Sequence, residues 1–291
     1  MKEIVIISGK GGTGKTSVTS SFALLAGKNA IIADCDVDAA DMHILMQPDY
    51  EIKEDFYSGE LAVINPETCT QCGICADICR FDAISIINNK HVVEPLSCEG
   101  CGYCARVCPV NAIKNIDLKV GQYFISNIKT GTKMVHAKLG IGADNSGKLV
   151  ANVKNEAKKL ALKLNKEFIL IDGSPGVGCP VTSSLSGAHF VVLVTEPTLS
   201  ALHDLKRVYV LVKKFNIKAA CIINKWDINT AVSSEIKDFL KKEGILHIAD
   251  LNYDEAFTKA MIQGKAIVEI EDSEVGKILK ESWETIKKNI S

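Results

Sequence analysis

Two copies of one cysteine pattern constrain this chain more than any other feature of its sequence. The spacing x2, x2, x3 occurs twice, in the runs Cys69, Cys72, Cys75, Cys79 and Cys98, Cys101, Cys104, Cys108. Each run is followed by Ala-Ile at the same offset, and Cys98 follows Cys69 by 29 residues, so the stretch is a duplicated half. Such spacings place several thiolates on one tight loop, where they can bind a common metal group.

The metal group is either an iron-sulfur cluster or zinc, and the spacing favours clusters. Zinc sites usually pair two CxxC units and rarely need four cysteines in one run. Residues 61–118 resemble bacterial two-cluster ferredoxins, in which the fourth cysteine of each run serves the other cluster. The resemblance implies two [4Fe-4S] clusters with exchanged fourth ligands, one on Cys69, Cys72, Cys75 and Cys108 and one on Cys98, Cys101, Cys104 and Cys79. Arg80 stands where ferredoxins often have Pro, which implies a local loop difference.

Composition excludes several classes of protein. The 291 residues suffice for about two domains, and a net charge of −1 gives no basic field for nucleic acid. The eleven cysteines leave an odd three outside the two runs, which indicates a reducing cytoplasm rather than a disulfide framework. The apolar start is too short for a signal peptide, and no apolar stretch approaches the roughly 20 residues of a membrane span. We therefore expect a cytoplasmic protein without a nucleic-acid or membrane partner.

A phosphate-binding loop opens the chain. An apolar stretch at residues 4–7 precedes it and a helical pattern at 17–27 follows, which is the strand-loop-helix context that such loops require. Backbone N–H groups of the loop would surround phosphate, Lys15 would face the β and γ phosphates, and Thr16 would offer its hydroxyl to Mg²⁺. The predicted nucleotide-binding residues are Gly9, Lys10, Gly11, Gly12, Thr13, Gly14, Lys15, Thr16 and Ser17.

Lys10 near the start of this loop makes it a deviant Walker A motif. The motif resembles that of the superfamily of the septum-site ATPase MinD, the nitrogenase iron protein and the Mrp-type cluster carriers. The resemblance covers nearly the whole chain outside the cysteine repeat and is most specific for members with an inserted ferredoxin domain. It implies that Lys10 reaches across a homodimer to the partner's phosphates, so that a lone subunit is a poor ATPase.

Two acidic strand ends resemble the switches of that superfamily. Residues 34–38 resemble switch I, where Asp36 would orient the attacking water; Asp38 is the reserve candidate, and strand capping is the alternative. Residues 168–171 form an apolar run that ends at Asp172, as in a Walker B strand, and Asp172 would hold Mg²⁺ through water.

The base-recognition segment is ambiguous. Asn224 begins an Asn-Lys-Trp-Asp sequence that resembles the superfamily's adenine contact and also matches the guanine motif of GTPases. The deviant Walker A favours ATP.

Three cysteines lie outside the repeat. Cys35 and Cys221 are expected to be buried small residues. Cys179 follows Asp172 by seven residues, near the offset at which the nitrogenase iron protein places a cluster ligand. This resemblance implies an additional metal or cluster site formed by two copies of Cys179 at a dimer interface; the alternative is a packed or reactive thiol.

Three further sequence patterns are weaker. The six histidines, His91 and His136 among them, lack metal-ligand spacing and are interpreted as surface or packing residues. The helical pattern from Val275 to Ile290 is interpreted as a core-packing helix, because its acidic residues dilute the basic face that a membrane helix would need. Residues 119–147 are interpreted as a return connection.

Together these features predict an α/β fold, a doubly wound and mostly parallel sheet with an inserted α+β ferredoxin-like domain. The predicted domains are an ATPase domain at 1–60 and 119–291 and an inserted two-cluster domain at 61–118. The leading hypothesis is a homodimeric ATPase for ATP-dependent assembly or delivery of a metal-sulfur cluster to an apo-metalloprotein or cluster carrier. The alternatives are an ATP-gated electron donor and a MinD-like positioning ATPase.

Overall fold

The computed structural model describes residues 1–140, 142, 143 and 145–290. They form two compact units. Unit 1 comprises Met1–Glu54, Tyr123–Lys138 and Ser146–Ser291, and unit 2 comprises Asp55–Gln122 and Leu139–Asn145. The predicted domain boundaries after residues 60 and 118 stay predictions, because they fall inside two strands, β3 (Ile52–Ile64) and β6 (Ile113–Asn127), that continue through them.

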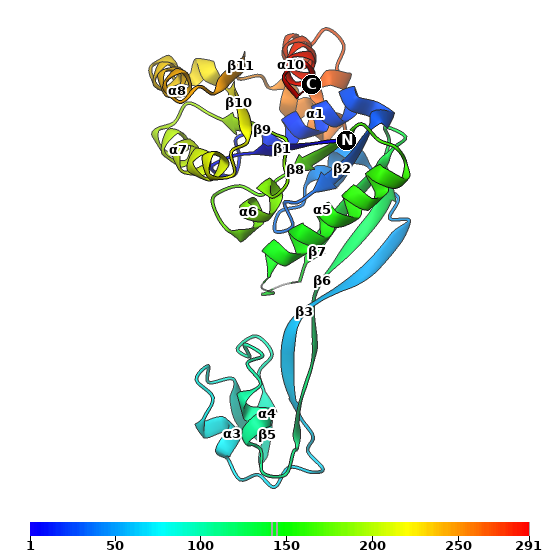
Figure 1. Cartoon of the computed structure of the whole chain (residues 1–291), viewed down its shortest axis with the longest axis vertical. Coiled ribbons are helices and arrows are strands. Elements are labelled where there is room, and N and C mark those ends of the chain that lie inside the picture. Colours follow the sequence, from blue (N-terminus) through cyan, green and yellow to red (C-terminus); the bar gives the residue numbers. More distant parts are fainter. Residues whose placement is uncertain (141, 144, 291) are drawn as a thin grey trace. The chain divides into compact units, whose positions relative to one another are not determined.

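Unit 1 is an α/β structure in which helices alternate with strands (Figure 1). Its further strands are β1 (Lys2–Ile7), β2 (Ala30–Asp34), β7 (Lys133–Leu139), β8 (Phe168–Asp172), β9 (Phe190–Thr195), β10 (Lys218–Asn224) and β11 (Leu246–Leu251). Its helices are α1 (Lys15–Ala26), α2 (Met42–Met46), α5 (Ser146–Lys163), α6 (Cys179–Leu185), α7 (Leu199–Lys214), α8 (Thr230–Glu243), α9 (Ala256–Ile262) and α10 (Glu274–Ile290).

The sheet order places β1 at the centre of unit 1. The order is β11-β10-β9-β1-β8-β2-β7-β6-β3, and every pair from β11 to β7 is parallel. The chain leaves β1 toward β2 on one side and later returns to β9 on the other. Ligands of such sheets bind beyond the carboxyl ends of the strands at this kind of switch point. The predicted doubly wound, mostly parallel sheet is confirmed.

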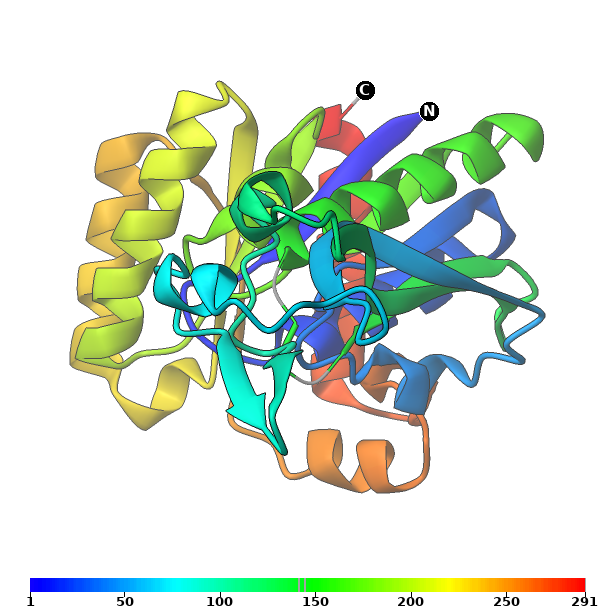
Figure 2. The same cartoon turned by 90° about the horizontal axis from the view of Figure 1, so that it is seen from below.

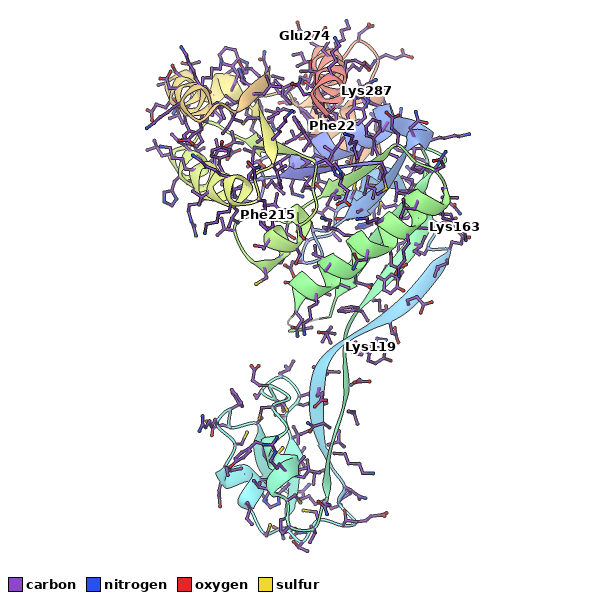
Figure 3. All side chains as sticks on the ribbon, viewed as in Figure 1. Phe22, Lys119, Lys163, Phe215, Glu274 and Lys287 are labelled. Atoms are coloured by element: carbon purple, nitrogen blue, oxygen red, sulfur yellow. The ribbon has the colours of Figure 1, made fainter. Side chains whose placement is uncertain are left out.

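Helices cover both faces of the sheet. Figures 1 and 2 show α1 and α10 on one face and α5, α6 and α7 on the other. Phe22 of α1, labelled in Figure 3, packs with its ring centroid 5.6 Å from that of Trp283 in α10. Val275, Leu279, Trp283, Ile286 and Ile290 are buried. The core-packing interpretation of the last helix is therefore confirmed.

Unit 2 repeats its elements as the sequence repeats. The short helices α3 (Ile74–Asp77) and α4 (Tyr103–Val107) each follow a glycine with positive φ, Gly73 at 82° and Gly102 at 71°. Strands β4 (Ile84–Ile87) and β5 (Lys90–Val93) form an antiparallel hairpin. This arrangement fits the predicted ferredoxin-like insert.

One sequence interpretation was wrong. Residues 119–147 are not simply a connection, because β6 and β7 occupy most of the segment and extend the main sheet. The sequence pattern of both strands is weak, because β6 mixes buried and exposed residues irregularly and β7 is short, with lysines and a histidine among its apolar residues. Residues 141 and 144 lie outside the described residues. No helix in the described part of the chain is long and apolar enough to cross a membrane.

Candidate functional site

The phosphate-binding loop joins β1 to α1 at the carboxyl edge of the sheet. Gly12 and Gly14 adopt φ of 80° and 90°, a region that glycine enters without steric cost. A Cβ at Gly14 would also lie 2.4 Å from Asn224 Nδ2. The glycines are thus required by backbone conformation at both positions and by close packing at Gly14.

Charged groups from three elements converge behind this loop. Lys15 Nζ at the start of α1 lies 2.9 Å from Asp172 Oδ1 at the end of β8 and 3.3 Å from Asp36 Oδ2 after β2. The Thr16 hydroxyl donates to Asp172 Oδ2 at 2.8 Å, and the Thr19 hydroxyl donates to Asp172 Oδ1 at 2.7 Å. The structure therefore brings together the predicted residues Lys15, Thr16, Asp36 and Asp172.

The charge balance of this cluster is acidic. Burial raises the pKa of Asp34 well above its usual range, with the neighbouring Asp172 carboxylate adding to it, and burial also raises the pKa of Asp36. Burial alone would lower the pKa of Lys15, but Asp172 and Asp36 more than offset it and the net pKa is raised. Asp34 Oδ2 has no hydrogen-bond partner among the described residues. Carboxylates in excess of one lysine, beside a hydroxyl, suit a hard divalent cation such as Mg²⁺.

A cavity of about 380 Å³ lies over this cluster. It is lined by Ser8, Gly11, Gly12, Gly14, Lys15, Thr16, Ser17, Asp36, Ala39, Asp41, Ile44, Leu45, Pro175 and Met261. Asp36 faces this cavity, whereas Asp38 is exposed and is absent from the described lining. The geometry thus favours Asp36 over Asp38.

Lys10 is held within its own subunit. Its Nζ lies 2.7 Å from Glu196 Oε1 and within 3.3 Å of Thr198 Oγ1. Glu196 Oε2 also pairs with Lys225 Nζ at 3.0 Å. One carboxylate after β9 therefore binds two lysines beside the loop, an arrangement that the sequence did not predict.

Asn224, at the end of β10, contacts the phosphate-binding loop. It is buried, its Nδ2 donates to Thr13 O at 2.9 Å, and its Oδ1 accepts from Lys225 N at 3.0 Å. Both ends of the amide are therefore engaged inside the protein, and its contact with a nucleotide base stays a prediction.

In unit 2, the eight repeat cysteines separate into two pockets. One of about 500 Å³ is lined by Cys79, Cys98, Cys101 and Cys104, together with apolar residues and Arg80. The other, of about 20 Å³, is lined by Cys69, Cys72, Cys75 and Cys108. Each pocket takes three cysteines from one run and the fourth from the other, which is the grouping that the ferredoxin resemblance implied.

The pockets have the donor chemistry that a cluster needs. Ala83 N–H donates to Cys79 Sγ at 3.4 Å and Ala112 N–H donates to Cys108 Sγ at 3.3 Å, at equivalent repeat positions. Burial raises the pKa of the Cys75 and Cys104 thiols, so a metal that binds them would have to stabilise the thiolate form. Among the described residues, no group of three or more His, Cys, Asp or Glu converges as a single ion requires. Four cysteines in each pocket are the donor set that a [4Fe-4S] cluster requires, with one thiolate for each iron.

Cysteines outside the repeat differ in exposure. Cys35 and Cys221 are buried, as expected, and burial raises the pKa of both thiols. Cys179 is exposed at the first residue of α6, beside Gly147 of α5. Its role at a dimer interface stays a prediction.

Two residues of the nucleotide site, Thr19 and Asp34, were not predicted from the sequence. Thr19 lies four residues after Lys15 on the same face of α1, and that spacing is the signal that could have identified it. Asp34 was treated only as part of a switch, although its place as the last residue of a buried strand beside β8 indicates a position at the site.

The comparisons with known proteins agree with both units. Residues 62–115 match the family described as a 4Fe-4S dicluster domain. An uncharacterized protein of Methanocaldococcus jannaschii, MJ0578, is 34% identical over 99% of this chain and 97% of its own length.

Solved structures show the fold. The cell-division ATPase MinD of Pyrococcus furiosus is similar with a TM-score of 0.59 at 19% identity, over 99% of both chains. The septum site-determining protein MinD of Pyrococcus horikoshii, complexed with Mg-ADP, gives a TM-score of 0.60 at 19% identity, over 99% of this chain and 96% of that one. The chain therefore belongs to the family of MJ0578; it has the fold of the MinD structures, and its residues 62–115 match a 4Fe-4S dicluster domain.

Proposed function

We propose that this chain is an ATP-hydrolysing homodimer that carries two [4Fe-4S] clusters and assembles or delivers a metal-sulfur cluster. One observation carries the proposal: a phosphate-binding site with converging Lys15, Thr16, Asp36 and Asp172 and two four-cysteine pockets occur in one chain. A nucleotide switch and cluster ligands in the same polypeptide support coupling of hydrolysis to cluster handling.

Hydrolysis would be phosphoryl transfer to water. Lys15 and the loop N–H groups bind the phosphates, and Asp36, which lines the cavity, orients the attacking water. Mg²⁺, held through Thr16 and Asp172, supplies neutralising charge when bound. In the dimer, the Lys10 ammonium leaves Glu196 and contacts the phosphates bound to the partner subunit. A complete site therefore forms only in the dimer. Adenine rather than guanine is the proposed base, read by Asn224.

The clusters occupy the two cysteine pockets in the grouping described above. They supply one-electron redox chemistry or the iron and sulfide to be transferred. The inserted domain is taken as residues 61–118, within an ATPase domain formed by residues 1–60 and 119–291. The recipient is an apo-metalloprotein or a cluster carrier in the cytoplasm, and Cys179 at the dimer interface provides an additional metal or cluster site.

Three variants test the nucleotide part. Lys15→Ala should abolish ATP binding, because the buried ammonium is the main positive charge of the cavity. Lys10→Ala should still bind ATP but lose ATP-induced dimerisation and turnover, and Asp36→Ala should bind ATP and stay dimeric because the water is not positioned. Light scattering at micromolar protein measures the mass; an Asp36→Ala protein that stays monomeric with ATP would refute the cross-dimer role of Lys10.

A second function, ATP-gated electron donation, is favoured by the completeness of the pockets. Each holds four cysteines, so both clusters can be permanent residents rather than cargo. Iron that stays in the protein through many rounds of ATP hydrolysis, while an electron acceptor is reduced, would support this second function.

A further inference from the structure

The two cysteine pockets differ at one equivalent position of the repeat. Ala62 precedes Cys69 by seven residues and His91 precedes Cys98 by seven, within the matching sequences Ala-Val-Ile-Asn-Pro-Glu-Thr-Cys and His-Val-Val-Glu-Pro-Leu-Ser-Cys. Ala62 lines the pocket of Cys79, Cys98, Cys101 and Cys104, whereas His91 lines the pocket of the other four cysteines. The pseudo-symmetry thus places an imidazole beside one cysteine set and a methyl group beside the other.

His91 is oriented inward by its strand. It lies on β5, whose side chains alternate, so that Lys90 and Val92 are exposed while His91 is 8% exposed. Neither ring nitrogen has a hydrogen-bond partner in the described part of the chain. A buried imidazole carries at least one N–H, and leaving it unpaired is costly. The pocket it lines contains soft sulfur ligands and otherwise mainly apolar side chains.

We propose that His91 donates an N–H hydrogen bond to a sulfur of the cluster held by Cys69, Cys72, Cys75 and Cys108, and so raises that cluster's reduction potential above that of the other. The inference rests on the cluster assignment of the proposed function. Reduction adds one electron to the cluster, and a donor aimed at sulfur stabilises the added negative charge. Hydrogen bonds to sulfur are among the factors that set the potentials of such clusters. Ala62 offers no donor to the second cluster.

The expected consequence is a chain with two unequal clusters. Electrons supplied by a reductant would reside first on the cluster beside His91, which fixes the order in which the two are reduced. His91 acts only through the cluster, by setting its reduction potential, and is not a catalytic residue.

Potentiometric titration of the anaerobic reconstituted protein with dithionite, followed by EPR, tests this inference. His91→Leu should lower one midpoint potential by ~59 mV, which corresponds to about a tenfold change in the equilibrium constant of a one-electron reduction. The other midpoint potential should stay unchanged and serves as an internal control. His91→Gln keeps an N–H donor and should retain most of the potential. Equal potentials in wild type and His91→Leu would overturn the inference while leaving the cluster assignment intact, whereas wild-type protein without iron would overturn the assignment itself.

A second measurement tests the inference even if the leucine variant does not take up iron. Pulsed EPR of wild-type protein labelled with ¹⁵N-histidine should show a nitrogen coupling to one reduced cluster, and His91→Gln should lose it. Absence of the coupling in labelled wild-type protein would contradict the proposal.

Discussion

At the residue scale, buried polar groups explain most of the site. Asp172 connects the cluster, because its carboxylate accepts hydrogen bonds from Thr16 and Thr19 and forms an ion pair with Lys15. It is 1% exposed, so each of these contacts acts in a medium where an unpaired charge is expensive. Removing any one donor should therefore disturb the whole cluster.

Thr19 provides the cleanest test of that cluster. Thr19→Val keeps the shape and removes the hydroxyl that donates to Asp172, so we expect a loss of about 1.5–3 kcal/mol in the free energy of unfolding. Thr19→Ser keeps the donor and should lose clearly less. Urea denaturation of both variants measures the difference; equal stability of Thr19→Val and wild type would show that the hydrogen bond contributes nothing net.

His136 provides a pH test in unit 1. Burial lowers its pKa to about 4, and its ring lies 2.9 Å from the Ser126 hydroxyl. The unfolded chain, with a pKa of about 6.5, takes up the proton first, so stability is complete above pH 6.5 and is lost as pH falls toward 4. Between pH 7 and 5 the wild type should lose about 2 kcal/mol more than His136→Gln in urea denaturation. Parallel pH profiles for the two proteins would contradict this assignment.

At the element scale, the two pockets and the resemblance to two-cluster ferredoxins predict the same grouping of the cysteines. Double substitutions in one pocket, such as Cys79→Ser with Cys98→Ser, should leave the other cluster and about four irons per chain. Substitutions divided between the pockets but within one run, Cys69→Ser with Cys79→Ser, should remove both clusters. Iron analysis after anaerobic reconstitution distinguishes the cases, and the reverse pattern would mean that each run serves its own cluster.

Helix α10 is the other element with a measurable role. Trp283 is 3% exposed and packs on Phe22 and on Phe168, with ring centroids 5.6 and 5.4 Å away. Trp283→Ala should lower the free energy of unfolding by about 3–5 kcal/mol. Lys280→Ala, on the exposed side of the same helix, should change it by less than about 0.5 kcal/mol. A small effect at Trp283 would mean that α10 is not part of the core.

The sequence predicted these elements unevenly, for physical reasons. Buried parallel strands such as β8 are continuous apolar runs and were predicted directly, whereas the grouping of the cysteines was implied by the resemblance to two-cluster ferredoxins. Strand β6 was missed because its buried and exposed residues alternate irregularly, and β7 was missed because polar and apolar residues are mixed in a short, mostly buried segment. The contact of Lys10 with Glu196 joins residues far apart in sequence, and so only the folded chain shows it. His91 was interpreted as a surface or packing residue because a lone histidine carries no spacing signal. Its equivalence to Ala62 was visible in the repeat, but its burial was not.

At the scale of the whole molecule, the proposed function joins a nucleotide switch to cluster ligands in one chain. Conformational change at the switch residues is useful only if something binds differently in the two nucleotide states. In the proposed function that differently bound group is the metal-sulfur cluster, and its release to an acceptor is the output. The same logic predicts that ATP binding without Lys10 is unproductive, since no complete site forms.

The most direct test is anaerobic transfer of ⁵⁵Fe from the reconstituted protein to an apo-ferredoxin used as acceptor probe. The proposed function predicts that MgATP accelerates the appearance of ⁵⁵Fe in the acceptor. Lys15→Ala protein loaded with the same iron should transfer it only at the rate seen without nucleotide. Transfer at one rate with and without MgATP in the wild type, while the protein hydrolyses ATP, would contradict it.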